Sequence, residues 1–378
     1  MSKKGGLMME WLPHDVVERI LETLAVKSLL RFKAVSKQWK STIESPLFQA
    51  KQLKQRQQLR DPDVLMVYPP DIENLRTLVL GSSSSVKIPI HWQKEKENKH
   101  YFVTYHSCDG LVCLYHPLKS GFVLNPATRW YRHLPLCQFQ RRMIHLGDSY
   151  LKLVNQIYNV GFGKDLFTGT YKAVWLYNNN SSKENGLTTC EVFDFSTNAW
   201  RYVTPAAPYG IVGVVHPVFV NGSLHWFTDC WQETKVISFD LHTETFQVLS
   251  KAPFASVHYD HYEIVMCNLD NRLCLSEKIC WSNQVIWSFD SGNKTWDKVC
   301  SIDLHLTRAL YDCPTQGAFH PLALLGGKNK KKKNLLFYDR MQSKTLWTHD
   351  LETESDHVAF SDYYIGYPVC YFQSLISI

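Results

Sequence analysis

The spacing of apolar side chains changes after the first 60 residues of the chain. Between Val16 and Leu24 they recur at helical intervals along one face, and two further apolar stripes follow before a basic segment. Ser28 is placed to cap the second of these helices, and Ser45 followed by Pro46 is a start signal for the last one. The pattern predicts several short helices joined by almost no loop.

From about residue 64 onward, short strands alternate with turn residues, and one unit recurs. In each copy an apolar residue precedes Asp or Asn, and an aromatic side chain stands six positions further on. The starting positions lie 69, 46, 50 and 49 residues apart, and a period near 50 is typical of a repeated supersecondary unit. The copies are Asn125 to Tyr131, Asp194 to Trp200, Asp240 to Phe246 and Asp290 to Trp296, with a looser fifth from Asp339 to Trp347.

A second tight turn precedes the Asp of each copy, as in Cys108-Asp109-Gly110. Two hairpins per period make a four-stranded antiparallel sheet, and sheets arranged radially protect one another's edges. We therefore predict an all-β propeller, with six blades; a Greek-key sandwich is the rival fold, but it gives no reason for this period. Strands near Val64 to Val67 or Leu78 to Leu80 are expected to pair with the C-terminal strands and close the ring.

The repeated acidic and aromatic residues invite a functional interpretation. A residue that recurs once per blade, however, occupies the same structural place in every blade, so turn formation and packing explain it better. We expect each carboxylate to accept hydrogen bonds from the turn backbone. These structural repeat positions are Asp194, Trp200, Asp240, Asp290 and Trp296.

The helical segment presents more apolar surface than it can bury by itself. Domains of about 40 residues usually need a metal, disulfides or a partner, and the 11 cysteines of the chain include no CxxC pair. The first 60 residues carry 12 Lys and Arg against 5 Asp and Glu, whereas the remaining 318 carry 29 against 30. The segment is therefore expected to dock on another, acidic protein. The alternative is that its helices pack only on the larger domain of the same chain.

Three stretches of the helical segment match a known pattern: Leu12-Pro13, then Leu24 to Phe32, then Val35 to Trp39. In this order they resemble the F-box family, from which Ala25 departs, because the family usually has proline there. The resemblance implies binding to a Skp-type adaptor, which links to cullin and RING subunits. For each leucine, a place in the module's own core is the alternative. The implied adaptor-binding residues are Leu12, Pro13, Ile20, Leu21, Leu24, Leu29 and Leu30.

The order of motifs after the helices supports a second resemblance. CDGLVCLYHP, FVLNPATRWYRHLP and VFDFSTNAWRYV follow one another between about Ser107 and Ile302, and the closing YFQSLISI is a fainter echo. This order resembles the F-box-associated domain of plant F-box and kelch-repeat proteins, although a lysine-rich insertion and residues 64–100 depart from it. The resulting domain plan is a disordered N-terminus at 1–10, an F-box module at 11–60 and a kelch-like propeller at 61–378.

Motifs for catalysis are absent: the chain has no GxSxG elbow, no phosphate-binding glycine loop and no HExxH. His258 and His261 are the nearest metal candidates, with an ordinary polar loop as the alternative. Lys328 and Lys330 to Lys333 suggest a nuclear-import signal, an acidic partner or a solvated hairpin loop. The polar insertion at about 136–150 and the NNNSSKENG loop are candidates for contact with a target protein.

Together these observations favour the substrate-recognition subunit of an SCF-type ubiquitin ligase, which is not itself an enzyme and needs no cofactor. No run of about 18 apolar residues occurs, and Met1 to Trp11 is too weakly apolar for a secretory leader, so we expect a cytoplasmic or nuclear protein with no membrane partner. The alternatives are a protein-binding scaffold outside a ligase and a metal-dependent kelch-type oxidase. A nucleic-acid binder is disfavoured by the near-neutral charge of the larger domain.

Overall fold

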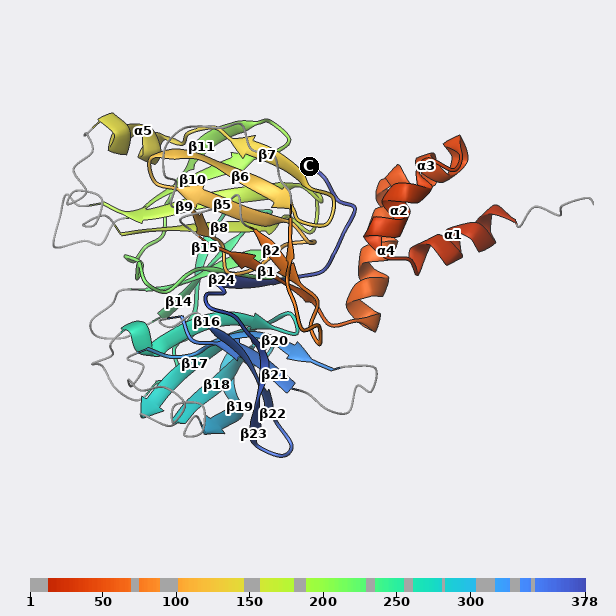
Figure 1. Cartoon of the computed structure of the whole chain (residues 1–378). Helices are drawn as coiled ribbons and strands as arrows, with labels where there is room; N and C mark the ends of the chain where they lie inside the picture. Colours follow the sequence, from red (N-terminus) through yellow and green to blue (C-terminus); the bar gives the residue numbers. More distant parts are fainter. Residues whose placement is uncertain are drawn as a thin grey trace, which may run out of the picture.

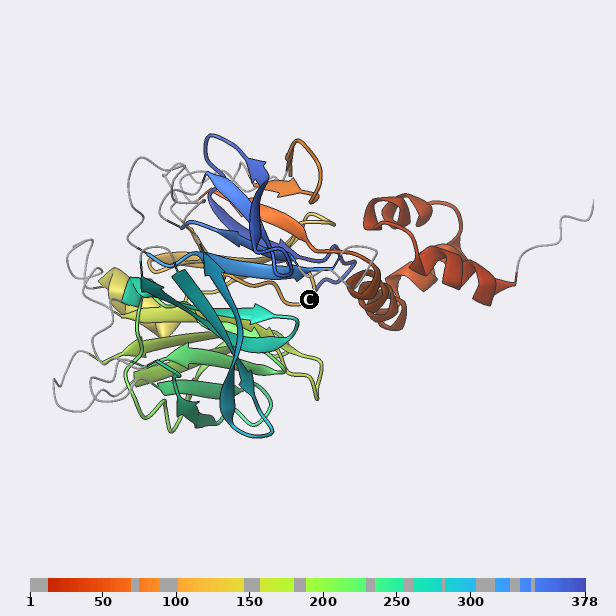
Figure 2. The ribbon, with the colours of Figure 1, turned by 90° about the horizontal axis from the view of Figure 1, so that it is seen from below.

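Four helices form an arm beside a ring of six small β-sheets in the computed structural model (Figures 1 and 2). The expected order, a small helical module followed by a six-bladed propeller, is confirmed. The expected disordered N-terminus and Leu12 lie outside the described residues. Among those residues, no helix is both long and apolar enough to span a membrane. The structure describes residues 13–68, 75–88, 101–145, 157–179, 188–228, 235–254, 261–280, 283–303, 317–326, 334–340 and 344–378.

The arm consists of α1 (His14–Glu22), α2 (Val26–Phe32), α3 (Lys37–Glu44) and α4 (Pro46–Leu59).

Serine side chains begin two of these helices. The Ser36 hydroxyl accepts from the Trp39 N–H at 3.1 Å at the start of α3, and the Ser45 hydroxyl accepts from the Phe48 N–H at 3.2 Å at the start of α4. The cap expected at Ser28 is wrong, because α2 already begins two residues earlier and Ser28 lies within its first turn.

Each blade is a four-stranded antiparallel meander whose first strand lies nearest the ring axis, where it contacts the first strands of neighbouring blades. Blade two contains β4 (Phe102–Val103), β5 (Val112–His116), β6 (Lys119–Asn125) and β7 (Trp130–Leu134), and blade three contains β8 (Tyr158–Lys164), β9 (Tyr171–Asn178), β10 (Thr188–Asp194) and β11 (Ala199–Val203). Blade four contains β12 (Val218–Val220), β13 (Ser223–Phe227), β14 (Lys235–Asp240) and β15 (Phe246–Lys251), and blade five contains β16 (Ile264–Leu269), β17 (Arg272–Cys280), β18 (Asn283–Asp290) and β19 (Thr295–Asp303). Blade six contains β20 (His320–Leu325), β21 (Asn334–Tyr338), β22 (Thr345–Asp350) and β23 (Ser355–Ser361).

The first blade joins the two ends of the propeller. Its innermost strand is β24 (Tyr367–Tyr371), followed outward by β1 (Asp63–Val67), β2 (Arg76–Leu78) and β3 (Val86–Lys87). In the β1–β24 ladder, Val64 lies opposite Cys370 and Val67 opposite Tyr367. Of the two expected closures, the pairing through Val64 to Val67 is therefore confirmed.

The repeated Asp forms the turn between the third and fourth strands. Asp194 Oδ1 accepts from the Ser196 N–H at 2.8 Å, and Asp240 Oδ1 accepts from the Thr243 N–H at 2.7 Å. Asp290 Oδ1 accepts from a turn N–H in the same way, at 2.8 Å. Four positions after the Asp or Asn, a residue other than glycine adopts a left-handed conformation with φ between 53° and 62°: Arg129, Asn198, Glu244, Lys294 and Glu354.

The repeated tryptophans connect neighbouring parts of the sheet system through their indole N–H groups. Trp200 donates to the Pro135 carbonyl at 2.6 Å, and Trp296 donates to the Ser250 hydroxyl at 2.7 Å.

The fifth copy of the repeat, expected from Asp339 to Trp347, is wrong. Trp347 lies in β22 opposite Phe337 of β21, so this segment contains the connection between the second and third strands. The equivalent turn follows Asp350. Its Oδ1 accepts from the N–H groups of Glu352 and Thr353, at 2.9 and 3.1 Å.

The propeller has two different faces. Turns between the first and second strands meet around a central cavity together with Gln57 of α4, so this side is called the arm face. In an antiparallel meander, the connections between the second and third strands and between blades lie at the opposite end. This opposite side, the far face, carries α5 (Gln138–His145), which Figure 1 shows away from the arm.

Candidate functional site

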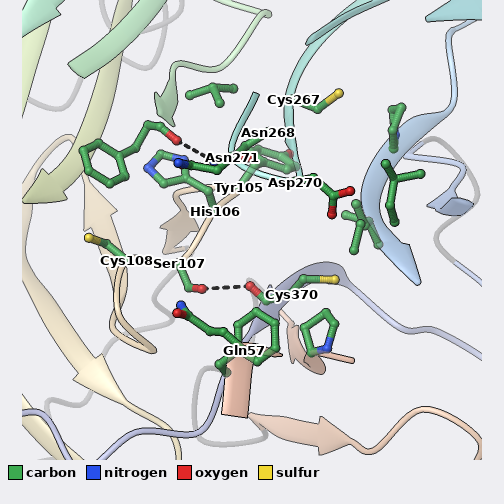
Figure 3. Close-up of a pocket in the computed structure, with 18 of the residues that line it drawn as sticks. Gln57, Tyr105, His106, Ser107, Cys108, Cys267, Asn268, Asp270, Asn271 and Cys370 are labelled. Carbon is green, nitrogen blue, oxygen red and sulfur yellow. Dashed lines mark hydrogen bonds between the residues drawn. The ribbon is translucent and has the colours of Figure 1, made fainter. Parts of the chain in front are cut away.

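A cavity of about 550 Å³ lies at the centre of the arm face (Figure 3). All six blades and the arm contribute to its lining. Gln57 comes from α4, Cys370 from the closing strand, and Asp109, Asn221 and Asn271 from the tight turns that the sequence predicted. The cavity thus lies where the helical arm meets the ring axis.

Several polar groups of the cavity form hydrogen bonds with other groups of the chain. The Ser107 hydroxyl donates to the Cys370 carbonyl at 2.9 Å, and the Asn268 amide donates to a main-chain carbonyl at 2.9 Å (Figure 3). Asp109 accepts from Lys164 Nζ at 2.8 Å. These contacts join neighbouring blades around the axis.

Burial favours the uncharged forms of one histidine and two cysteines of the cavity. Burial lowers the pKa of His106 to about 4, even though its Nε2 is within 2.8 Å of the Phe162 carbonyl. Burial raises the pKa of the Cys370 thiol to about 12, and a hydrogen bond with the Cys274 thiol, together with burial, raises that of Cys267. A neutral imidazole and protonated thiols can accept or donate hydrogen bonds, but they are not activated for attack on a substrate.

Aromatic and imidazole rings from four blades meet around Tyr105. The ring centre of Tyr105 lies 4.2 Å from that of His216, 5.5 Å from that of His320 and 5.8 Å from that of Tyr367. The Arg340 guanidinium lies 5.8 Å from the same ring centre. Burial and the nearby Arg340 lower the pKa of His320 to about 3, so this imidazole is neutral at physiological pH.

The other candidates for chemistry lie mainly outside the described residues. His258, Lys328 and Lys330 to Lys333 are among those left undescribed, and His261 begins a short 3₁₀ helix (His261–Glu263). Within the described part of the chain, no group of three or more His, Cys, Asp or Glu side chains is arranged to hold a metal ion.

The helical arm has its own small core. Leu21 and Leu29 are 1% and 0% exposed, and they pack with Val26, Ile43 and Phe48. Two of the leucines implied as adaptor-binding are thus core residues, which is the alternative that the sequence left open. Leu24 and Leu30 are half-buried against this core, whereas Pro13 and Ile20 are exposed.

The C-terminal tail completes that core. Leu375, 5% exposed, packs among the arm residues, and Ala127 of the β6–β7 turn lies beside it. On either side of Leu375, the Ser374 and Ile376 carbonyls accept from the Asn125 side-chain amide, at 3.0 and 2.9 Å. The arm therefore packs on the chain's own propeller, through Leu375 and Ala127.

Comparison with known proteins agrees with this architecture. Residues 9–51 match the family described as the F-box domain, and residues 64–378 match the F-box associated beta propeller domain. This chain belongs to the F-box protein family. An Arabidopsis thaliana F-box/LRR-repeat/kelch-repeat protein is 64% identical over 386 residues, which cover 100% of both chains. Two Arabidopsis thaliana F-box proteins are 48% and 49% identical, covering 98% of this chain and 100% and 85% of theirs.

The F-box keeps several apolar side chains on its surface after its core is complete. Ile20 and Val16, one turn apart on α1, are 48% and 37% exposed. Val35, which opens the Val-Ser-Lys-x-Trp motif, is 59% exposed, and Leu47 at the start of α4 is 67% exposed. Val16, Val35 and Leu47 were not among the implied adaptor contacts. These four side chains are too exposed to contribute to the module's own core.

Proposed function

We propose that this F-box protein is the substrate-recognition subunit of an SCF-type ubiquitin ligase. Its F-box binds a Skp-type adaptor, and through it cullin and RING subunits, while the propeller holds a target protein. Its part in ubiquitylation is to hold the target near a separately bound conjugating enzyme, so catalysis is by proximity and requires no reactive group of this chain. This role places the protein in the cytoplasm or nucleus.

The observation that carries the proposal is the exposed apolar surface of the F-box. Leu21, Leu29 and their neighbours already fill the core, so Ile20, Val35 and Leu47 have no further place within it. Full burial of one such side chain contributes about 1.5–3 kcal/mol of favourable free energy. Burial of these side chains against an adaptor would therefore stabilise the complex. Pro13 and Ile20 are the implied adaptor residues that remain exposed, and we keep Leu12, Leu24 and Leu30 in the proposed contact beside them.

The far face of the propeller is the proposed site for the target. The arm occupies the opposite side of the ring (Figure 1), so a target on the far face meets no obstruction from the adaptor. The connections between blades lie on this face, and the sequences of such loops can vary without destabilising the cores of the blades.

Co-purification with a Skp-type adaptor tests the proposal. Ile20→Asp places a charge in the proposed contact and is expected to reduce adaptor binding at least tenfold, because an unpaired charge is costly to bury. Ile279→Asp is the matched control: Ile279 is 58% exposed but lies at the far-face end of β17, so this variant should bind the adaptor as the wild type does.

Equal binding by all three proteins would show that the adaptor does not use this surface. If the folded wild type binds no adaptor at all, the ligase role is wrong and the chain is better described as a protein-binding scaffold outside a ligase.

A further inference from the structure

The position of helix α5 on the far face is fixed by its contacts with blade three. Phe139 and Met143 pack it on Trp175 and Tyr177 of blade three. The buried Glu191 carboxylate fixes its first turn by accepting from the Gln138 and Phe139 N–H groups, both at 2.7 Å. A carboxylate at a helix N-terminus also offsets the helix dipole there. The orientation of α5, and of its outer side, is therefore set by the blade.

The outer side of α5 is basic and partly apolar. Arg141, Arg142 and His145 are exposed, and the helix contains no acidic residue. Ile144 is 46% exposed on the same helix, and Tyr202 of β11, near Arg142, is 55% exposed. We call these five residues the α5 surface.

The cations of this surface differ from the others of blade three. Lys172 and Arg201 both pair with Glu244, the former at 2.7 Å. Among the described residues, by contrast, no carboxylate lies within ion-pair distance of Arg141 or Arg142. Arg142 lies over the Tyr177 ring, with its guanidinium 5.3 Å from the ring centre.

We propose that the α5 surface docks an acidic segment of the target protein that also carries an apolar side chain; this inference rests on the proposed function. Arginine forks bind carboxylates in a bidentate manner, and arginine and tyrosine are enriched at the energetic centres of protein interfaces. A nucleic acid would call for Lys and Arg spread along a face, whereas here the cations are confined to one helix and alternate with Ile144 and Tyr202.

A fluorescent peptide of twelve residues, with eight Glu or Asp and four interspersed Leu or Phe, is a suitable probe. Its affinity is measured for the full chain, bound to its adaptor, by fluorescence anisotropy. The double variant Arg141→Glu/Arg142→Glu is expected to weaken binding at least tenfold. The matched control is Arg272→Glu/Lys298→Glu, which makes the same charge change on exposed residues of blade five and should weaken binding by less than twofold.

The outcomes separate the two proposals. Equal loss in both variants would mean that only net charge matters, and would overturn the α5 surface, as would unchanged affinity in the first variant. Preference for a single-stranded oligonucleotide over the peptide would assign the surface to nucleic acid instead. Adaptor binding is measured in every sample. If the wild type binds the adaptor but not the peptide, only this inference is rejected. If the wild type does not bind the adaptor, the ligase role is rejected.

Discussion

The side-chain amide of Asn125 donates to the main-chain carbonyl of Ser374 at 3.0 Å, across 249 positions of sequence. Asn125 occupies the repeat position that holds Asp in blades three to six, and its Oδ1 forms the turn as those carboxylates do, accepting from the Ala127 N–H at 2.9 Å. An amide can do both, because it is an acceptor and a donor, whereas an ionised carboxylate only accepts. The second blade thus uses its repeat position to hold the C-terminal tail.

Replacing Asn125 by Asp is expected to destabilise the protein by about 1–3 kcal/mol, because a buried anion would then face the Ser374 and Ile376 carbonyl oxygens in place of the amide that now donates to them. Urea unfolding measures the free-energy change. The reciprocal substitution Asp290→Asn is the control, since the exposed turn of blade five needs only the acceptor. If the two substitutions cost the same, the bonds from Asn125 to the tail contribute nothing to stability.

Gly110 and Gly169 allow backbone strain to be separated from a close contact with the tail. Both have positive φ, of 80° and 76°, but a Cβ on Gly110 would lie 2.3 Å from the Phe372 carbonyl oxygen, whereas one on Gly169 would meet nothing within 4 Å. Gly169→Ala is expected to cost about 1 kcal/mol, as a left-handed alanine does. Gly110→Ala should cost at least twice as much in urea unfolding, and similar values would contradict the packing of the tail against this turn.

Stability should fall as the pH is lowered from about 6.5 toward 5. Burial lowers the pKa of His225, which is 7% exposed, to about 4. In this interval the unfolded chain therefore binds a proton that the folded chain excludes, and protonation favours unfolding. His225→Gln should flatten the dependence of the urea midpoint on pH in this interval. An unchanged slope in His225→Gln would assign the effect to other groups.

The propeller could be predicted from sequence because each blade repeats the same local solution. A tight turn needs residues that tolerate positive φ, and the Asp that begins the next turn bonds to its own backbone, so both are visible in the residues themselves. The last blade was misplaced because Asp356 stands six positions after Asp350 where the other copies have an aromatic residue. The turn of the last blade therefore has the expected Asp but not the aromatic residue expected six positions later.

The F-box surface was harder to predict, because helical spacing alone does not tell the core side of a stripe from its neighbour. Leu21 is buried and Ile20, the preceding residue, is half exposed, a difference that depends on how α1 lies against α4. The sequence predicts a polar insertion where α5 lies, although Phe139 and Met143, four positions apart, are a helical signal. Contact between Leu375 and the F-box core depends on the closed ring, and no local pattern announces it.

The C-terminal residues have a consequence for synthesis. β24 is the innermost strand of the first blade, and Leu375 just beyond it fills the F-box core. The ribosome makes these residues after the other strands of the ring and the helices of the F-box, so neither the ring nor the F-box core is complete on a chain that stops before Leu375. In the proposed ligase, assembly would thus select chains that have been translated past Leu375.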